Sequence, residues 1–136
     1  GVVMRPEKAR PGPEVPLTTI DKLVGELGLE RVDFIKMDIE GCEGRALRGM
    51  LGLLRRHRPV ILSEFGPQML MAMSDITPEA YLQQLRSPGY DLFIVEKDSP
   101  GTFTRASDGE ILARFKADGA MTHLDLLALP QDRRAD

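Results

Sequence analysis

The amino-acid sequence predicts an α/β fold with a parallel βαβ core followed by antiparallel strands. Two apolar runs, residues 32–39 and 60–65, have the length of buried strands, and apolar side chains at helical spacing occupy residues 42–57 between them. Strands that alternate with helices favour a parallel sheet. After residue 89 short apolar runs follow one another across turn residues, which favours antiparallel pairing.

The first sixteen residues differ from the rest in composition. Four of them are proline, so residues 1–16 are interpreted as an extended N-terminal arm rather than a helix or strand. The α/β domain is expected over residues 17–130, and residues 131–136 are expected to form a polar tail.

Local signals mark the ends of the helices in the first half. Residues 20–27 have helical spacing, with Thr19 as the N-terminal cap and Gly28 as a left-handed end. Pro59 opens the second strand. Residues 66–75, which contain one proline and three methionines, are interpreted as a loop, and Thr77 followed by Pro78 predicts the start of another helix.

The second half is expected to contain mainly strands. Asp108 followed by Gly109 indicates a hairpin between two of them, and Pro130 ends the last one. The predicted strands cover residues 90–96, 102–105, 111–115 and 122–129.

Composition limits the classes of partner. Among 136 residues, 21 acidic side chains against 18 basic ones leave no basic stripe, which argues against nucleic acid and anionic membranes. A single cysteine, Cys42, excludes an internal disulfide and suits a reducing cytoplasm, and no apolar run has the length of a membrane span. Small molecules or other proteins are the expected partners, and the expected location is cytoplasmic.

The most informative segment is Lys36-Met37-Asp38-Ile39-Glu40-Gly41, where an apolar run ends in two carboxylates and a glycine. Ligands of open α/β sheets bind outside the carboxyl ends of the strands. If the strand continues through Glu40, then Asp38 and Glu40 point to the same side with Cα atoms about 7 Å apart. A single proton, cation or polar substrate could then reach both carboxylates.

Each residue of this segment also has a structural interpretation. Asp38 and Glu40 could stabilise the positive end of the following helix. Gly41 could serve a sharp turn or the close approach of a ligand. Lys36 is expected to form an ion pair with the neighbouring carboxylates.

The second predicted strand is also an apolar run with an acidic residue near its end, where Glu64 and Phe65 lie. Glu64 either contacts the substrate or is a solvent-exposed residue at the end of the strand without a function. Together with Asp38 and Glu40 it could supply oxygen ligands for Mg²⁺, but no metal is part of the prediction. The histidines, His57 and His123, have no spacing that would indicate a metal ligand or a catalytic partner.

Five segments carry a resemblance to a known family, through their order and not through a single motif. These segments are Thr18-Thr19-Ile20-Asp21, Asp33-Phe34-Ile35-Lys36-Met37-Asp38-Ile39-Glu40-Gly41-Cys42-Glu43, Ala46-Leu47-Arg48-Gly49, Arg58-Pro59-Val60-Ile61-Leu62-Ser63-Glu64 and Gly89-Tyr90. Over residues 15–130 the chain thereby resembles the FkbM-type methyltransferase family.

This resemblance implies a doubly wound, Rossmann-like fold and an S-adenosylmethionine-dependent methyltransferase that modifies hydroxyl groups on sugars or natural products. Asp38 and Glu40 would be catalytic, Asp38 and Gly41 would contact the cofactor, and Glu64 and Phe65 would contact the small-molecule hydroxyl acceptor. The alternative is a noncatalytic remnant or protein-interaction domain that keeps the sheet without the cofactor site.

The sequence departs from the family pattern before Val15. The glycine-rich loop after the family's first strand and the acidic residue after its second strand have no counterpart, so the chain resembles the carboxyl half of the family's domain. A partial doubly wound sheet is therefore expected, with one strand edge unpaired. Such an edge predicts self-association or pairing with a missing N-terminal half.

Overall fold

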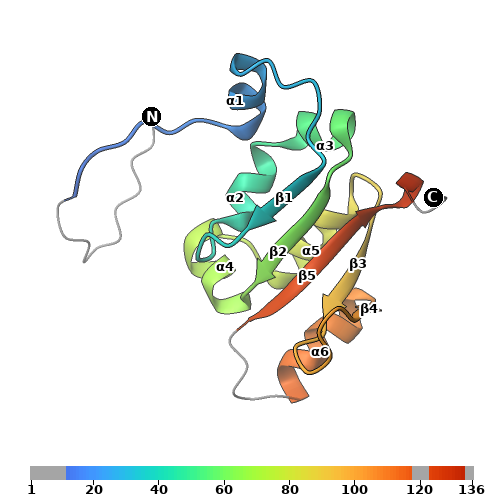
Figure 1. Ribbon diagram of the computed structural model, residues 1–136. Helices are drawn as coiled ribbons and strands as arrows, with labels where there is room; N and C mark the ends of the chain where they lie inside the picture. Colours follow the sequence, from blue (N-terminus) through green and yellow to red (C-terminus); the bar gives the residue numbers. More distant parts are fainter. Residues whose placement is uncertain (1–11, 118–122, 134–136) are drawn as a thin grey trace.

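The computed structural model describes residues 12–117 and 123–133, in which helices pack against a five-stranded mixed sheet (Figure 1). Its strand order is β1-β2-β5-β3-β4. The strands are β1 (Phe34–Met37), β2 (Val60–Phe65), β3 (Tyr90–Val95), β4 (Phe103–Arg105) and β5 (Leu124–Pro130). Only β1 and β2 pair in parallel among the described strands, and the other pairings are antiparallel. The predicted α/β class, with a parallel pair and an antiparallel ending, is confirmed.

Two helices begin where the sequence predicts. In α1 (Ile20–Glu26) the Thr19 hydroxyl accepts the Lys22 amide at 3.2 Å, and in α5 (Pro78–Arg86) the Thr77 hydroxyl accepts the Ala80 amide at 3.1 Å. Each cap satisfies a backbone donor that the first helical turn leaves without a partner. These caps are local, so the sequence alone is enough to locate them.

The first strand is shorter than predicted. It was expected over residues 32–39, but β1 ends at Met37 because the chain turns over Ile39, Glu40 and Gly41. Glu40 has φ 55° and Gly41 has φ 92°, and the Cys42 amide donates back to the Ile39 carbonyl at 3.2 Å. These backbone angles are incompatible with an extended strand.

The helix expected over residues 42–57 is two helices, α2 (Glu43–Arg48) and α3 (Leu51–His57). Both oxygens of the Asp21 carboxylate accept backbone amides of α3, from Gly52 at 2.9 Å and Leu53 at 2.8 Å. The Asp21 amide in turn donates to the Gly49 carbonyl at 2.9 Å. Helix α1 therefore docks at the break and provides the cap that α3 lacks in its own sequence.

Residues 66–75, expected to form a loop, contain α4 (Pro67–Ser74). Pro67 is at the first position of this helix, where its lack of an amide hydrogen costs nothing. Leu70 is fully buried, and Asp75 ends the helix in the left-handed conformation with φ 51°. The prediction was wrong because Gly66 and Pro67 were interpreted as turn residues, whereas proline is also favoured at the first position of a helix.

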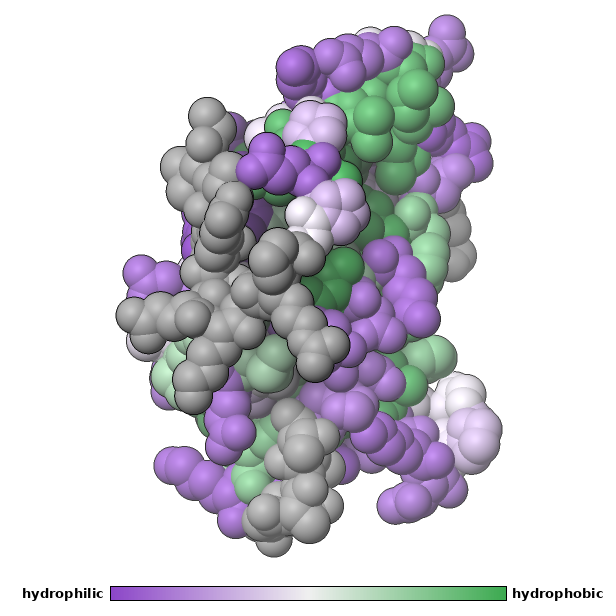
Figure 2. All heavy atoms as spheres, turned by 90° about the vertical axis from the view of Figure 1, so that its left-hand side faces the viewer, coloured by the Kyte–Doolittle hydropathy of each residue, from purple (hydrophilic) through white to green (hydrophobic). Residues whose placement is uncertain are grey.

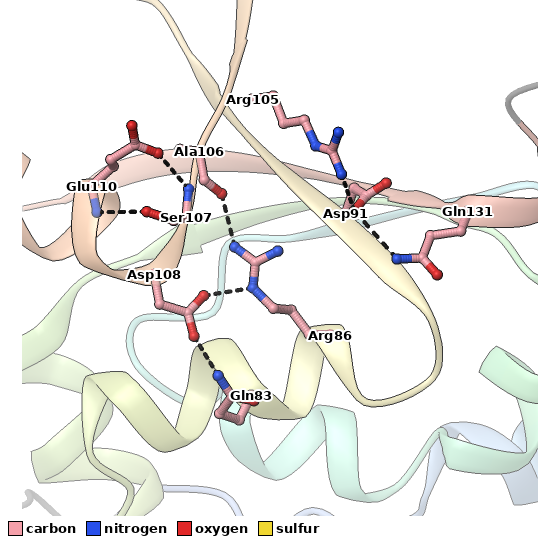
Figure 3. Close-up of polar contacts among 9 residues, drawn as sticks. All are labelled: Gln83, Arg86, Asp91, Arg105, Ala106, Ser107, Asp108, Glu110 and Gln131. Carbon is pink, nitrogen blue, oxygen red and sulfur yellow. Dashed lines mark hydrogen bonds and ion pairs between the residues drawn. The ribbon is translucent and has the colours of Figure 1, made fainter.

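The hairpin expected at Asp108-Gly109 and the strand expected over residues 111–115 are also wrong, because this segment is α6 (Asp108–Ala117). The Ser107 hydroxyl accepts the Glu110 amide at 3.2 Å, and a Glu110 carboxylate oxygen accepts the Ser107 amide at 2.7 Å (Figure 3). This reciprocal pair is a capping box, which starts a helix. Thr122, expected to begin the last strand, lies outside the described residues.

The sheet is covered on one face. Ile61, Ser63 and Phe65 of β2 are buried. The centroid of the Phe65 ring lies 6.1 Å from that of Tyr81 in α5 and 5.4 Å from that of Phe115 in α6. The alternate residues of the same strand are only half-buried. We call this second side of the sheet the open face.

Strand β1 forms one edge of the sheet and pairs only with β2 among the described strands. The unpaired edge that the sequence predicted is therefore present. Its outer backbone groups have no strand beside them in this part of the chain. No helix in the described ranges is both long and apolar enough to cross a membrane.

Candidate functional site

A small pocket of about 150 Å³ lies where β1 and β2 end. Its walls come from the turn after β1, the start of α2, the end of β2, the start of α4 and the residue before β5. Three of the lining side chains are carboxylates and one is an imidazole. The lining residues are Glu40, Gly41, Glu43, Glu64, Gly66, Met69 and His123.

The turn that carries Asp38 and Glu40 is held from two sides. The Glu43 carboxylate, which is 2% exposed, accepts the Ile39 amide at 2.9 Å. The Ser74 hydroxyl donates to the Gly41 carbonyl at 2.5 Å. Both contacts use the backbone, so they fix the path of the turn.

Gly41 fits this turn because it has no side chain. A Cβ added there would lie 2.6 Å from the carbonyl carbon of Met69, and the backbone angle of φ 92° disfavours any L-residue. The group that approaches Gly41 closely is therefore the backbone of α4. The structure supports the turn interpretation of Gly41, and a cofactor contact stays a prediction.

Asp38 and Glu40 do not lie on one strand face, because β1 ends before both. They nevertheless lie near Glu64: the Asp38 carboxyl raises the pKa of Glu64, and the charge of Glu40 acts in the same direction. Lys36 lies 4.0 Å from Asp38, so the predicted ion pair is present, with both side chains more than half exposed. The turn thus brings together the acids that the sequence singled out.

Burial raises the pKa of Glu64 above the usual value, and the neighbouring Asp38 carboxyl raises it further. The His123 imidazole acts in the opposite direction, and the charges of Asp38 and Glu40 add to the rise. Glu64 therefore binds a proton more tightly than an ordinary glutamate.

His123 reaches this cluster through the pairing of β2 with β5. Glu64 is opposite Asp125 in that register, and His123 is two residues before Asp125, on the same side of the sheet. Its Nδ1 lies 3.3 Å from Glu64 Oε1. The sequence analysis missed His123 because the contact depends on which strands pair, and no local motif indicates it.

Phe65, expected to contact the acceptor, is placed on the covered face and is fully buried between Tyr81 and Phe115. The structure does not bring its ring to the pocket. Glu43, by contrast, lines the pocket and had been assigned no role of its own. In the described ranges no three His, Cys, Asp or Glu side chains are grouped as a metal site requires.

A second, wider hollow of about 660 Å³ lies between α5 and the start of α6. Figure 3 shows that its polar side chains bond with one another: Asp108 accepts Arg86 Nε at 2.5 Å and also the Gln83 amide. Arg86 donates to the Ala106 carbonyl at 2.8 Å as well. These contacts join the two helices, so we assign this hollow a structural role.

Comparison with protein families gives one match, to the methyltransferase FkbM domain over residues 5–119. The match includes the turn with Asp38 and Glu40, the strand end with Glu64, and helix α6, and it stops before β5. No curated protein and no solved structure matched the chain. Because the family match spans most of the sequence, the chain belongs to the methyltransferase FkbM domain family.

Proposed function

We propose that the chain is the acceptor-binding part of an S-adenosylmethionine-dependent methyltransferase that transfers a methyl group to a hydroxyl of a sugar or natural product. The observation that carries this proposal is the cluster of Asp38, Glu40 and Glu64 at the ends of the parallel strands. Ligands of α/β sheets bind at this edge. The family match gives the class of reaction.

The cluster has the chemistry that hydroxyl methylation needs. Carboxylates accept the hydrogen bond of a hydroxyl group and so can hold it in position for the reaction. Bound S-adenosylmethionine would supply a methyl group on a positively charged sulfur, which negative side chains favour. Asp38 and Glu40 would hold and orient the hydroxyl, and the fixed turn would limit their motion.

The described pocket does not fit the whole cofactor. Its volume of about 150 Å³ is below the roughly 300–1,000 Å³ typical of ligand sites. The backbone of Met69 also fills the space over Gly41. We therefore propose that residues outside this pocket hold the nucleoside, and that the pocket receives the acceptor.

The test is a methyl-transfer assay with S-adenosylmethionine that carries an isotopic label on its methyl group. The acceptors tested should be sugars and other hydroxyl compounds of three kinds: uncharged, bearing an amine, and bearing a phosphate. Each should be tested with the chain and with any longer protein that its gene encodes. We expect labelled product from neutral or amine-bearing acceptors, because the pocket is acidic. Absence of product from both proteins over the whole set would contradict the proposal.

A noncatalytic interaction domain is the second candidate, and the exposed apolar surface favours it. Figure 2 shows apolar residues gathered at the end of the molecule that carries α1, where Leu23, Leu27 and Leu29 are exposed. Phe34 on the edge strand is 55% exposed. Apolar surface beside an unpaired strand edge is typical of a binding surface for another polypeptide.

Cofactor binding separates the two candidates. Calorimetric titration of the chain with S-adenosylmethionine, repeated with any longer protein that its gene encodes, should show heat in at least one of the two proteins if the chain is part of an enzyme. No heat from either protein, together with association through β1, would favour the interaction domain.

A further inference from the structure

His123 adds to the pocket a group of a different kind from its three carboxylates. An imidazole takes up and releases a proton near neutral pH more readily than other side chains. Its side chain is 39% exposed and lines the pocket with Glu40 and Glu64. It is therefore within reach of a ligand that enters the pocket.

Glu64 is placed to orient this imidazole. Its Oε1 lies 3.3 Å from His123 Nδ1, and its side chain is 21% exposed, so the contact is partly shielded from water. Such contacts are often long in the absence of substrate and shorten when substrate binds. A hydrogen bond from Nδ1–H to a carboxylate fixes the tautomer in which the second ring nitrogen, Nε2, carries no hydrogen.

We propose that His123 is a catalytic proton acceptor of this pocket, oriented by Glu64 and acting on the hydroxyl group of the acceptor. In the proposed step the O–H bond breaks and a bond forms between the proton and His123 Nε2. The electron pair of the broken bond stays on the oxygen, which becomes the stronger nucleophile. Glu64 stabilises the positive charge that develops on the ring.

The other acidic groups near the site fit a pocket in which His123 accepts the proton and Glu64 orients His123. Asp38 and Glu40 lie in the turn after β1 and raise the pKa of Glu64, and Glu43 also lines the pocket. Asp125 is the charged neighbour of His123 on its own strand. A pocket of this charge favours the protonated ring that the step produces, because opposite charges attract.

The first test is the tautomer of the two histidines, measured from ¹⁵N chemical shifts at pH 8. His57 is an internal control, because its Nδ1 accepts the Val32 amide at 3.0 Å and its hydrogen must then be on Nε2. We expect the opposite tautomer for His123. Hydrogen on Nε2 of His123 in the wild-type chain would overturn the inference.

Two variants separate the role of Glu64 from a general change in the fold. Glu64→Leu removes the acceptor and should move the His123 hydrogen to Nε2, whereas Glu64→Gln keeps an oxygen acceptor and should retain the Nδ1 hydrogen. His57 should be unchanged in both. If His123 keeps the same tautomer in Glu64→Leu as in the wild type, Glu64 does not orient it.

The catalytic part of the inference rests on the proposed methyltransferase function and is tested in the methyl-transfer assay. His123→Gln should lower kcat at least about 100-fold and change KM less than about threefold, as loss of a proton acceptor does. Unchanged kcat would overturn the catalytic role. Absence of transfer by the wild type would contradict the proposed function, whereas the tautomer measurement decides the orientation of His123 independently.

Discussion

At the scale of single residues, Glu64 connects the parts of the candidate site. The carboxyls of Asp38 and Glu40 both raise its pKa, and its Oε1 lies 3.3 Å from His123 Nδ1. Because burial and these acids raise its pKa, the native state holds the Glu64 proton more tightly than the unfolded state does. The protonated form therefore contributes stability at low pH, and this contribution is lost as the pH rises.

The variant Glu64→Gln tests this relation. In the wild type this residue makes the free energy of unfolding fall as the pH rises above 4.5, the ordinary pKa of a glutamate, and the variant lacks that fall. We expect Glu64→Gln to be the more stable protein at pH 7 and to show no advantage near pH 3. Urea unfolding at several pH values measures the difference, and a difference that does not depend on pH would contradict the account.

Gly41 gives a second prediction at this scale. Gly41→Ala should lower the free energy of unfolding by at least about 3 kcal/mol, because it combines an unfavourable φ with overlap against Met69. Gly28 is the matched control, since its φ is also positive but nothing lies within 4 Å of an added Cβ.

Gly28→Ala should cost only about 1 kcal/mol, from backbone strain alone. Denaturant unfolding of both variants gives the comparison. Equal losses would show that the contact between Gly41 and Met69 does not hold the turn.

The sequence predicted part of the candidate site and omitted part of it. Asp38 and Glu40 are adjacent to Gly41, so a local motif contains all three. His123 joins the site only through the pairing of β5 with β2, and Glu43 acts through a backbone amide of the turn. The His123 contact depends on tertiary structure and has no signature in a single sequence. The Glu43 contact is local, since Glu43 lies only four residues after Ile39, and it was missed because the strand was expected to continue through Ile39.

At the scale of elements, α1 and α3 depend on one carboxylate. Asp21 accepts the amides of Gly52 and Leu53 at the start of α3. Asp21→Ala should lower the free energy of unfolding by about 1–2 kcal/mol, as loss of a helix cap does. Thermal or urea unfolding monitored by circular dichroism measures the loss.

Glu26→Ala is the control for this prediction, because Glu26 makes only an exposed ion pair with Lys22 at 3.6 Å. Its loss should cost less than about 0.5 kcal/mol. Equal effects of the two substitutions would show that Asp21 does not cap α3.

Local sequence signals were sufficient to predict some helix boundaries but not others. Thr19 and Thr77 cap helices with their own side chains, and both helix starts were predicted. The break between α2 and α3 depends on a carboxylate about thirty residues away, so periodicity alone indicated one helix. Helix α6 was missed although Ser107 and Glu110 form a capping box, because Asp108-Gly109 is also a hairpin signal.

At the scale of the whole molecule, one edge and one face of the sheet are uncovered in the described residues. Strand β1 has no second neighbour, and the open face has alternate half-buried residues along β2 and β5. Main-chain donors and acceptors at such an edge favour pairing with another strand. We propose that another polypeptide segment, or a second copy of the chain, pairs with β1.

Substitution of Phe34 tests this proposal. Phe34→Lys places a charge on β1 and should weaken self-association about tenfold, because loss of one partly buried aromatic contact costs about 1.4 kcal/mol. Sedimentation velocity over a range of concentrations measures the association. Phe103→Lys is the control, since Phe103 is 49% exposed on β4, at the opposite edge of the sheet. A wild-type chain that stays monomeric at every concentration would contradict self-association.

We propose that the carboxylates after β1 take part in methyl transfer. The most direct measurement is kcat/KM for Asp38→Asn and Glu40→Gln, with Asp98→Asn in an exposed bend as the control. The account predicts losses of at least about 100-fold for the first two variants and none for the third, in keeping with the usual contribution of acid–base groups. Turnover that is unchanged in Asp38→Asn and Glu40→Gln would contradict it.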